Sequence, residues 1–330
     1  MSGWMFKAIA LIALFLLGPI GRADAQEFPA KSITLIVPSS AGGPADVAAR
    51  LIVDRMSAIL GQSIVLETMP GAGGTIGMAR VARATPDGYT LLIHQSGFAI
   101  TPAIYSKLNF NTEKDFTTIG LVNFSASLLC GRENLPVKTY AELEAWIKGP
   151  GKPVKYAHPG PGTSGHLSML IHIRAMGDVQ VSAISYRGIA PAVNDMLGGH
   201  IDIASVSAAV ATPLVKSGKL KAFATAGSRR SADLPDLPTF GEVGHKQMER
   251  PFWHALFAPA ATPRSILEKL NAALRETLAD PKTMQAYERS SVEAHPEAMR
   301  SIEASHAYVQ SEIKLWARVV RENNVKMDTH

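Results

Sequence analysis

Short apolar runs alternate along the chain with longer stretches in which apolar residues recur at helical spacing. The first pair is an apolar, β-branched run at 33–37 and a helical pattern at 44–60, which Gly61 is placed to end. Two more strands are predicted at 64–66 and 89–93. Continuous apolar strands separated by helices indicate a parallel α/β sheet covered by helices on both faces.

The same pattern starts again after about residue 131 and predicts a second α/β unit. Its predicted strands are 154–157, 181–185, 201–204 and 220–225, and its predicted helices are 140–148, 164–176, 190–197 and 208–216. After a strand at 253–257, nearly all of the remaining sequence has helical spacing. If this tail packs on the first unit, the chain crosses twice between two lobes, which makes a hinged cleft. We assign residues 26–125 and 250–330 to lobe 1, and 126–249 to lobe 2.

The first 25 residues have the features of an export signal. Lys7 precedes a ten-residue apolar run, and Ala23-Asp24-Ala25 fits the small-x-small rule of signal peptidase. The run is shorter than the roughly 20 residues that span a bilayer. We therefore expect cleavage after Ala25 and a periplasmic protein.

Composition narrows the classes of ligand. The formal net charge is +5 and the basic residues are scattered, which slightly favours anionic ligands and does not indicate a nucleic-acid surface. The single cysteine, Cys130, excludes an internal disulfide and a cysteine metal cluster, and we expect it to be a buried small apolar residue. The histidines lack the spacing of a helical metal pair, so no metal is expected.

A Gly-rich loop at 38–44 joins the first predicted strand to the first helix. It contains Ser39, Ser40, Ala41 and Gly42. In an open α/β sheet such a loop lies at the carboxyl end of a strand, where free N–H groups and the helix dipole favour an anion. Asp46 either caps the helix or contacts the ligand, and we favour the cap. A second Gly-rich loop, at 70–77, is either a tight turn or part of the cleft wall.

A third Gly-rich loop, at 158–166, also precedes a helix. Its glycines fit G-x-G-x-x-G, but Tyr186 and Arg187 stand where a dinucleotide site requires an acidic residue. No cofactor is therefore expected. Thr163 and Ser164 supply hydroxyl groups and a helix N-cap beside free N–H groups, and this favours a small anion.

Enzyme signatures are missing, and one acidic residue is notable. The sequence contains no G-x-S-x-G, Walker A or H-E-x-x-H motif, so no catalytic residue is assigned. Asp202 lies within the predicted strand 201–204, which is costly for a carboxylate unless it is hydrogen-bonded. It either orders a neighbouring loop through backbone N–H groups or forms part of the cleft wall.

Seven segments in the same order resemble the substrate-binding receptors of tripartite tricarboxylate transporters, the Bug family. They are 36–46, Pro70-Gly71-Ala72-Gly73-Gly74, 86–91, 159–166, Tyr186-Arg187-Gly188, 197–202 and 234–239. The resemblance covers the whole mature chain. It implies a two-lobed type II periplasmic-binding fold that closes on a small carboxylate and delivers it to a membrane permease.

The resemblance also implies the contacts with the ligand. Ser39, Ser40, Ala41 and Gly42 would form one jaw, Thr163, Ser164 and Asp202 the other, and Ser96 a side contact. The receptor is expected to be a monomer.

The ligand class and the role of the protein stay open. The ligand could be a di-, tri- or aromatic carboxylate, and Phe98 and Trp253 either pack in the core or face an aromatic acid. The alternatives to a transport receptor are a signalling receptor and a hydrolase that uses Ser164 and His166. These two residues are two positions apart and do not share a helix face.

Overall fold

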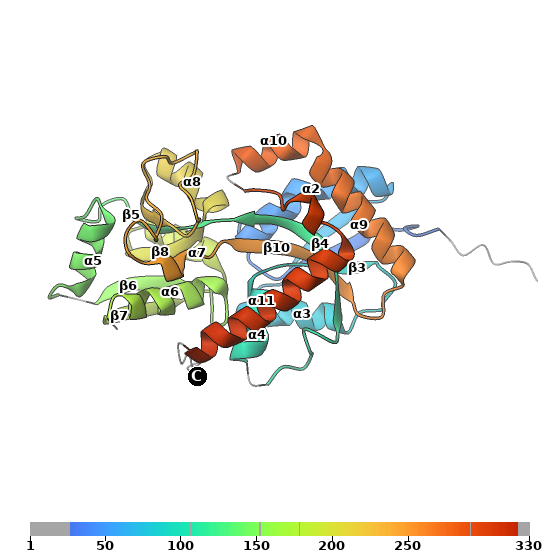
Figure 1. The fold of residues 1–330 in the computed structure, drawn as a ribbon, viewed down its shortest axis with the longest axis horizontal. Coiled ribbons are helices and arrows are strands. Elements are labelled where there is room, and N and C mark those ends of the chain that lie inside the picture. The colour runs from blue at the N-terminus through green and yellow to red at the C-terminus, as the bar shows by residue number, and fades with distance from the viewer. Residues whose placement is uncertain (1–26, 106, 152, 178, 291, 323–330) are drawn as a thin grey trace, which may run out of the picture.

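Two five-stranded sheets form the centres of two lobes that lie side by side (Figure 1). The computed structural model describes residues 27–105, 107–151, 153–177, 179–290 and 292–322, so the predicted export signal lies outside the described residues. Within these ranges, no helix combines the length and the apolar character needed to cross a membrane.

The sheet of lobe 1 has the strand order β2-β1-β3-β10-β4. Its strands are β1 (Ile33–Val37), β2 (Ile64–Thr68), β3 (Thr90–Gln95), β4 (Phe116–Ser125) and β10 (Phe252–Pro259). β1 pairs in parallel with β2 and β3, as predicted, whereas β10 is antiparallel to both of its neighbours. The prediction of a purely parallel sheet is wrong here because β10 enters from lobe 2 rather than through a crossover helix.

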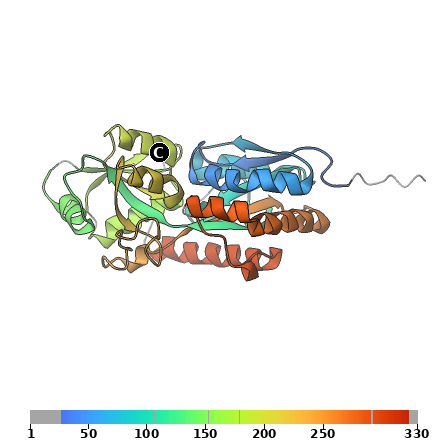
Figure 2. The same ribbon diagram turned by 90° about the horizontal axis from the view of Figure 1, so that it is seen from above.

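Two layers of helices cover this sheet (Figures 1 and 2). One layer consists of α2 (Pro44–Leu60), α9 (Arg264–Ala279) and α10 (Pro281–Arg289). The other contains η1 (Ala72–Gly74), α3 (Thr75–Ala82), α4 (Gly97–Ile104), η3 (Glu297–Met299) and α11 (Ile302–Glu322). Leu35 and Val37 belong to the core under α2, and Ile36 belongs to the core on the opposite face. β1 is apolar throughout because both of its faces are buried.

Lobe 2 repeats this arrangement with the strand order β7-β6-β8-β5-β9. Its strands are β5 (Ser127–Arg132), β6 (Val154–His158), β7 (Val181–Ser185), β8 (Ile203–Ser207) and β9 (Leu220–Thr225). Its helices are α5 (Tyr140–Lys148), α6 (Ser164–Ala175), α7 (Ile189–Leu197), α8 (Ala208–Lys216) and η2 (Lys246–Met248). β6 is parallel to β7 and β8, and β5 is antiparallel to β8 and β9.

The chain passes between the sheets twice. β4 continues into β5 with only Ala126 between them, and residues 226–251 lead from β9 back to β10 (Figure 1). The carbonyl oxygen of Ala126 accepts a hydrogen bond from Ala208 N at 2.8 Å, which fixes the first crossing to the start of α8. The lobe limits at 125/126 and 249/250 stay a prediction for the units that move.

Three outcomes follow for the predicted elements. The strand predicted at 201–204 is displaced, because β8 begins at Ile203 and Asp202 precedes it. α3 was predicted only as a helix that begins at the end of the loop 70–77, and α4, β4 and most of β5 were not predicted. Cys130 is fully buried in β5, which confirms the prediction of a buried apolar residue.

Candidate functional site

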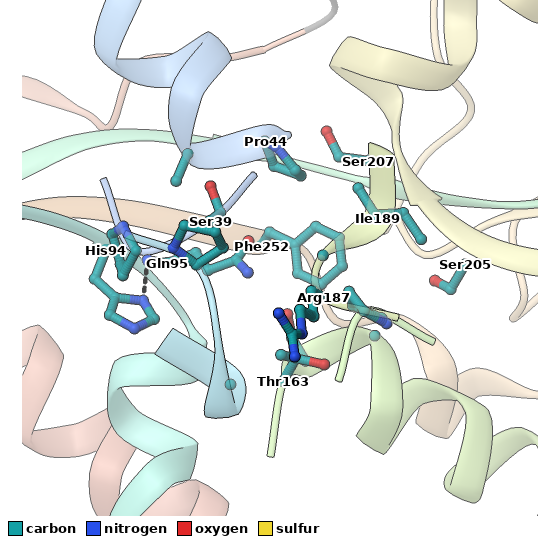
Figure 3. Close-up of a pocket in the computed structure, with 18 of the residues that line it drawn as sticks. Ser39, Pro44, His94, Gln95, Thr163, Arg187, Ile189, Ser205, Ser207 and Phe252 are labelled. Atoms are coloured by element: carbon teal, nitrogen blue, oxygen red, sulfur yellow. Dashed lines mark hydrogen bonds between the residues drawn. The ribbon is translucent and has the colours of Figure 1, made fainter. Parts of the chain in front are cut away.

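A small cavity lies between the two lobes at the carboxyl ends of β1, β3, β6 and β8 (Figure 3). The space open to the centre of a water-sized sphere is about 40 Å³. Since one water needs roughly 10–15 Å³ by this measure, the cavity in this arrangement of the lobes has room for a few water molecules. Lobe 1 contributes Pro38, Ser39, Pro44, Ala45, Pro70, Gly71, Gly73, His94, Gln95 and Phe252, and lobe 2 contributes Pro159, Thr163, Ser164, Gly165, Arg187, Gly188, Ile189, Ser205 and Ser207.

The lobes touch at the edge of this cavity. The hydroxyl group of Tyr105, at the end of α4, donates a hydrogen bond to Pro161 O in lobe 2 at 2.9 Å. A Cβ atom added at Gly73 would lie 2.4 Å from Pro161 O, and one at Gly188 would lie 2.4 Å from Ser40 Oγ. Glycine is therefore needed at both positions for the lobes to approach this closely, and the two lobes are in contact at the cavity.

The start of α6 forms one wall of the cavity. Thr163 is the N-cap, and its hydroxyl group accepts a hydrogen bond from His166 N at 3.2 Å and donates one to Gly160 O at 2.7 Å. Its proton is therefore already used within the loop. The N–H groups of Ser164 and Gly165 have no protein acceptor in the described part of the chain, and no acidic residue occupies the first turn. These N–H groups can bind an anion.

The loop before α2 forms the opposite wall. Ser39 lines the cavity, and its hydroxyl oxygen is buried without a hydrogen-bond partner among the described groups. Ser40 is also buried at its hydroxyl oxygen and packs against Gly188. Ala41 and Gly42 are exposed and do not line the cavity.

Asp46 orders the loop before α2. Its Oδ2 accepts a hydrogen bond from Gly42 N at 2.9 Å and forms an ion pair with Arg50 at 3.0 Å. The prediction that Asp46 caps α2 is wrong, because Gly43 is the N-cap and no side chain caps this helix. Asp46 instead holds the preceding loop through its bond from Gly42 N.

Ser96 and Asp202 are placed elsewhere than the resemblance implied. Ser96 Oγ accepts a hydrogen bond from Trp253 N at 3.1 Å, which ties the end of β3 to β10. Asp202 accepts bonds from Arg132 Nε and Lys155 N, both at 2.9 Å. It lies before β8, at the opposite end of the sheet from the cavity. In this structure both residues hold backbone segments in place.

The aromatic candidates are also away from the cavity. Phe98 stacks on Phe257 with ring centroids 4.0 Å apart, and both rings are in the core. Trp253 is buried and donates from Nε1 to Glu312 at 2.8 Å. The neighbouring Phe252 lines the cavity instead, because adjacent residues of a strand face opposite sides of the sheet.

Other lining residues were missed by the sequence reasoning. Arg187 follows β7. In the sequence it was considered only because a dinucleotide site would require an acidic residue at this position, and because it belongs to the family motif Tyr186-Arg187-Gly188. It is exposed to solvent and forms no ion pair with any described residue, so its side chain can turn toward a ligand in the cavity, with its charge partly screened by water. Ser205 and Ser207 alternate on β8, and the two-residue displacement of the predicted strand concealed them. Gln95 ends β3 within the segment 93–98, which differs from the usual family sequence and was therefore expected to influence ligand identity, although Gln95 itself was not named as a contact.

His94 is a neutral group at the lobe 1 end of the cavity. Burial lowers its pKa to about 4. Its Nδ1 accepts a hydrogen bond from Gln95 N at 2.8 Å, so the proton of the neutral ring is on Nε2. Nε2 is buried without a partner among the described atoms. Arg187 is thus the only cationic side chain that lines the cavity, and none of the lining residues is acidic.

Known proteins share this architecture. The tripartite tricarboxylate transporter family receptor profile matches residues 48–325. The Agrobacterium vitis "UPF0065 protein in the TAR-I ttuE-ttuC' intergenic region" is 36% identical over 301 residues, 91% of this chain and 87% of that protein. The periplasmic binding protein BugD has a TM-score of 0.87 at 35% identity, with 91% of this chain and 99% of BugD covered.

A further relative was solved with a ligand. MatC from Rhodopseudomonas palustris, with bound malate, has a TM-score of 0.85 at 34% identity, with 89% of this chain and all of MatC covered (100%). The chain therefore belongs to the tripartite tricarboxylate transporter receptor family and has the two-lobed α/β fold of periplasmic binding proteins.

Proposed function

We propose that this protein is a periplasmic receptor that captures a small carboxylate by closing its two lobes. The observation that carries the proposal is the meeting of three helix N-termini at one enclosed cavity. Ser164 and Gly165 of α6, Ile189 of α7 and Ser207, the N-cap of α8, all line it. None of these three helices has an acidic residue in its first turn, and Arg187 adds a positive charge.

The expected energies are sufficient for specific binding. A negative charge gains about 0.3–1 kcal/mol at an exposed helix N-terminus, and up to about 2 kcal/mol when partly buried. Each charge-assisted hydrogen bond from Ser164 N or Gly165 N adds about 1.5–3 kcal/mol. Against this stands the loss of hydration of the carboxylate, which enclosure makes necessary. Bound malate in MatC supports a carboxylate as the ligand class.

We assign two kinds of role to the candidate residues. Ser39, Ser164 and Arg187 line the cavity and would contact the ligand. Thr163 also lines it, but its hydroxyl proton is bonded to Gly160 O, so it would hold the loop before α6. The candidates that do not line the cavity would support the fold around it. They are Ser40, Ala41, Gly42, Ser96 and Asp202.

Closure would occur about the two chain crossings, with residues 26–125 and 250–330 moving against 126–249. The contact between Tyr105 and Pro161 then forms only in the closed state, so binding and closure stabilise each other. We propose that the closed monomer, after cleavage of the leader at Ala25, is recognised by a membrane permease.

A thermal-shift screen of mono-, di-, tri- and aromatic carboxylates tests the proposed ligand class. At least one class should raise the melting temperature at concentrations above its dissociation constant. The absence of any shift, confirmed by calorimetry, would contradict the proposal.

Two rival functions predict other results. A hydrolase would release product from an ester panel, and Ser164→Ala would abolish this release. A signalling receptor would leave carboxylate uptake unchanged in a deletion strain and would abolish induction by that carboxylate. Loss of uptake supports the transport receptor.

A further inference from the structure

The hydrogen-bond donors at the two ends of the cavity are not equivalent. In lobe 2 the N–H groups of Ser164 and Gly165 have no protein acceptor in the described chain, and the Arg187 side chain is unpaired there. In lobe 1, Gly42 N donates to Asp46, Gly43 N donates to Ser40 O at 3.0 Å, and Pro44 has no N–H group. Among the cavity-lining residues at the start of α2, only Ala45 keeps an N–H group without an acceptor in the described chain.

The charged residues near the cavity also differ between its lobe 1 end and its lobe 2 end. Asp46 lies in the first turn of α2, directly after the cavity residues Pro44 and Ala45. Its side chain is 3% exposed, whereas its partner Arg50 is 62% exposed. Water screens the cation more strongly than the carboxylate, so the charge of Asp46 is offset only in part and makes the lobe 1 end less favourable for an anion than the lobe 2 end.

The buried hydroxyl group of Ser207 indicates that the lobe 2 wall of the cavity binds a polar group of the ligand. Ser207 is the N-cap of α8 and is 2% exposed, and its Oγ has no partner among the described atoms. Figure 3 shows Ser207, Ser205 and Ile189 on the lobe 2 side of the cavity, opposite Ser39 and Gln95. A buried hydroxyl group without a partner is costly unless a ligand or water bonds to it.

The lobe 1 end offers neutral hydrogen-bonding groups instead. Gln95 lines the cavity, and its carboxamide, which both donates and accepts, has no partner among the described residues. Ser39 Oγ is likewise unpartnered there. These groups can bond to a hydroxyl, carbonyl or amide group, and none of the cavity-lining residues that the described part of lobe 1 contributes carries a charge.

We propose that the ligand is a monocarboxylate with an uncharged polar group at its other end. Its carboxylate is held by lobe 2, at Ser164, Gly165, Ser207 and Arg187, and its polar end is held by Gln95 and Ser39 of lobe 1. This proposal rests on the proposed carboxylate receptor and adds the orientation and charge of the ligand.

Calorimetric titration with matched ligand pairs tests this proposal. The pairs are succinate and succinamate, glutarate and glutaramate, and adipate and adipamate, which differ only in the charge of one end. In the pair of best length, the amide should bind at least tenfold more tightly. Tighter binding of the dicarboxylate in every pair that binds would overturn the proposal.

A charge variant provides a second readout. Gln95→Lys places a cation at the lobe 1 end and should reverse the preference within the best pair. Gln285→Lys adds the same charge on an exposed position of α10 in the same lobe and should leave the preference unchanged. An unchanged preference in Gln95→Lys would contradict the assignment of the polar end to Gln95.

The same titrations separate this proposal from the proposed function. If none of the six compounds binds while an aromatic or tricarboxylic acid does, the proposed charge of the ligand is wrong and the carboxylate receptor stands. If no carboxylate of any class binds, the proposed function itself is wrong.

Discussion

The variant Gly73→Ala, which adds one methyl group between the lobes, tests whether the lobes close through the contact between Tyr105 and Pro161. In Gly73→Ala the new Cβ would lie 2.4 Å from Pro161 O and 2.9 Å from the Tyr105 hydroxyl. Carbon–oxygen contacts are usually at least about 3.3 Å, so the lobes must separate here by roughly 0.9 Å. That movement breaks the hydrogen bond from Tyr105 to Pro161, which contributes about 0.5–1.5 kcal/mol. The dissociation constant should therefore rise by roughly two- to tenfold or more.

Gly61 supplies the matched control. Its φ is +68°, close to the +66° of Gly73, but a Cβ atom there has no neighbour within 4 Å. Both variants should lose about 1–2 kcal/mol of stability from left-handed strain, and only Gly73→Ala should weaken binding. Calorimetry measures the affinity, and small-angle scattering of the ligand-saturated protein should show a larger radius of gyration for Gly73→Ala. Equal affinities of the two variants would refute closure through this contact.

Three further predictions concern charge and stability. Arg187→Gln should weaken carboxylate binding by about tenfold and reduce its salt dependence, measured by calorimetry at two ionic strengths, and an unchanged affinity would remove Arg187 from the site. Asp202→Ala should lower the free energy of unfolding by about 1–3 kcal/mol through the lost bonds to Arg132 and Lys155, with an unchanged dissociation constant; a weakened affinity would instead make Asp202 a ligand contact. Acid should destabilise the protein because burial lowers the pKa of five described histidines, His158 among them, below the unfolded value of about 6.5. The pKa falls to about 4 for His94 and His295, and to about 3 for His172 and His254. Their contribution is complete above pH 6.5 and is lost as the pH falls toward 4, so calorimetry should show a melting temperature that decreases from pH 7 to pH 5, and a flat profile would contradict this.

The fold could be predicted from the sequence wherever the hydrophobic pattern was regular. β1 and α2 have their predicted limits because the strand is buried on both faces and Gly61 ends the helix in a left-handed conformation. The family resemblance is confirmed by the matching profile and by the solved relatives. The direction of β10 could not be predicted, because it depends on how the chain returns from lobe 2.

The site was harder to predict because it is assembled from both lobes. The loops that contain Ser39 and Ser164 do meet at the cavity, as their positions after parallel strands suggested. Other lining residues were missed because the predicted limits of two strands were inexact. β8 begins two residues later than predicted, so Ser207 lay outside the predicted strand, and β10 begins one residue earlier, at Phe252 rather than Trp253. The sequence around Arg187 does not distinguish an arginine that lines a cavity from any other surface arginine. Its position at the cavity is evident only once α6 and α7 are placed together.

A crystal structure of the protein with the best ligand from the carboxylate screen would show where the carboxylate binds. We expect one unmodified ligand in the cavity, with carboxylate oxygens about 2.7–2.9 Å from Ser164 N or Gly165 N and with Tyr105 in contact with Pro161. A carboxylate bound outside the cavity, or bound at the lobe 1 end away from the α6 N-terminus, would contradict this expectation.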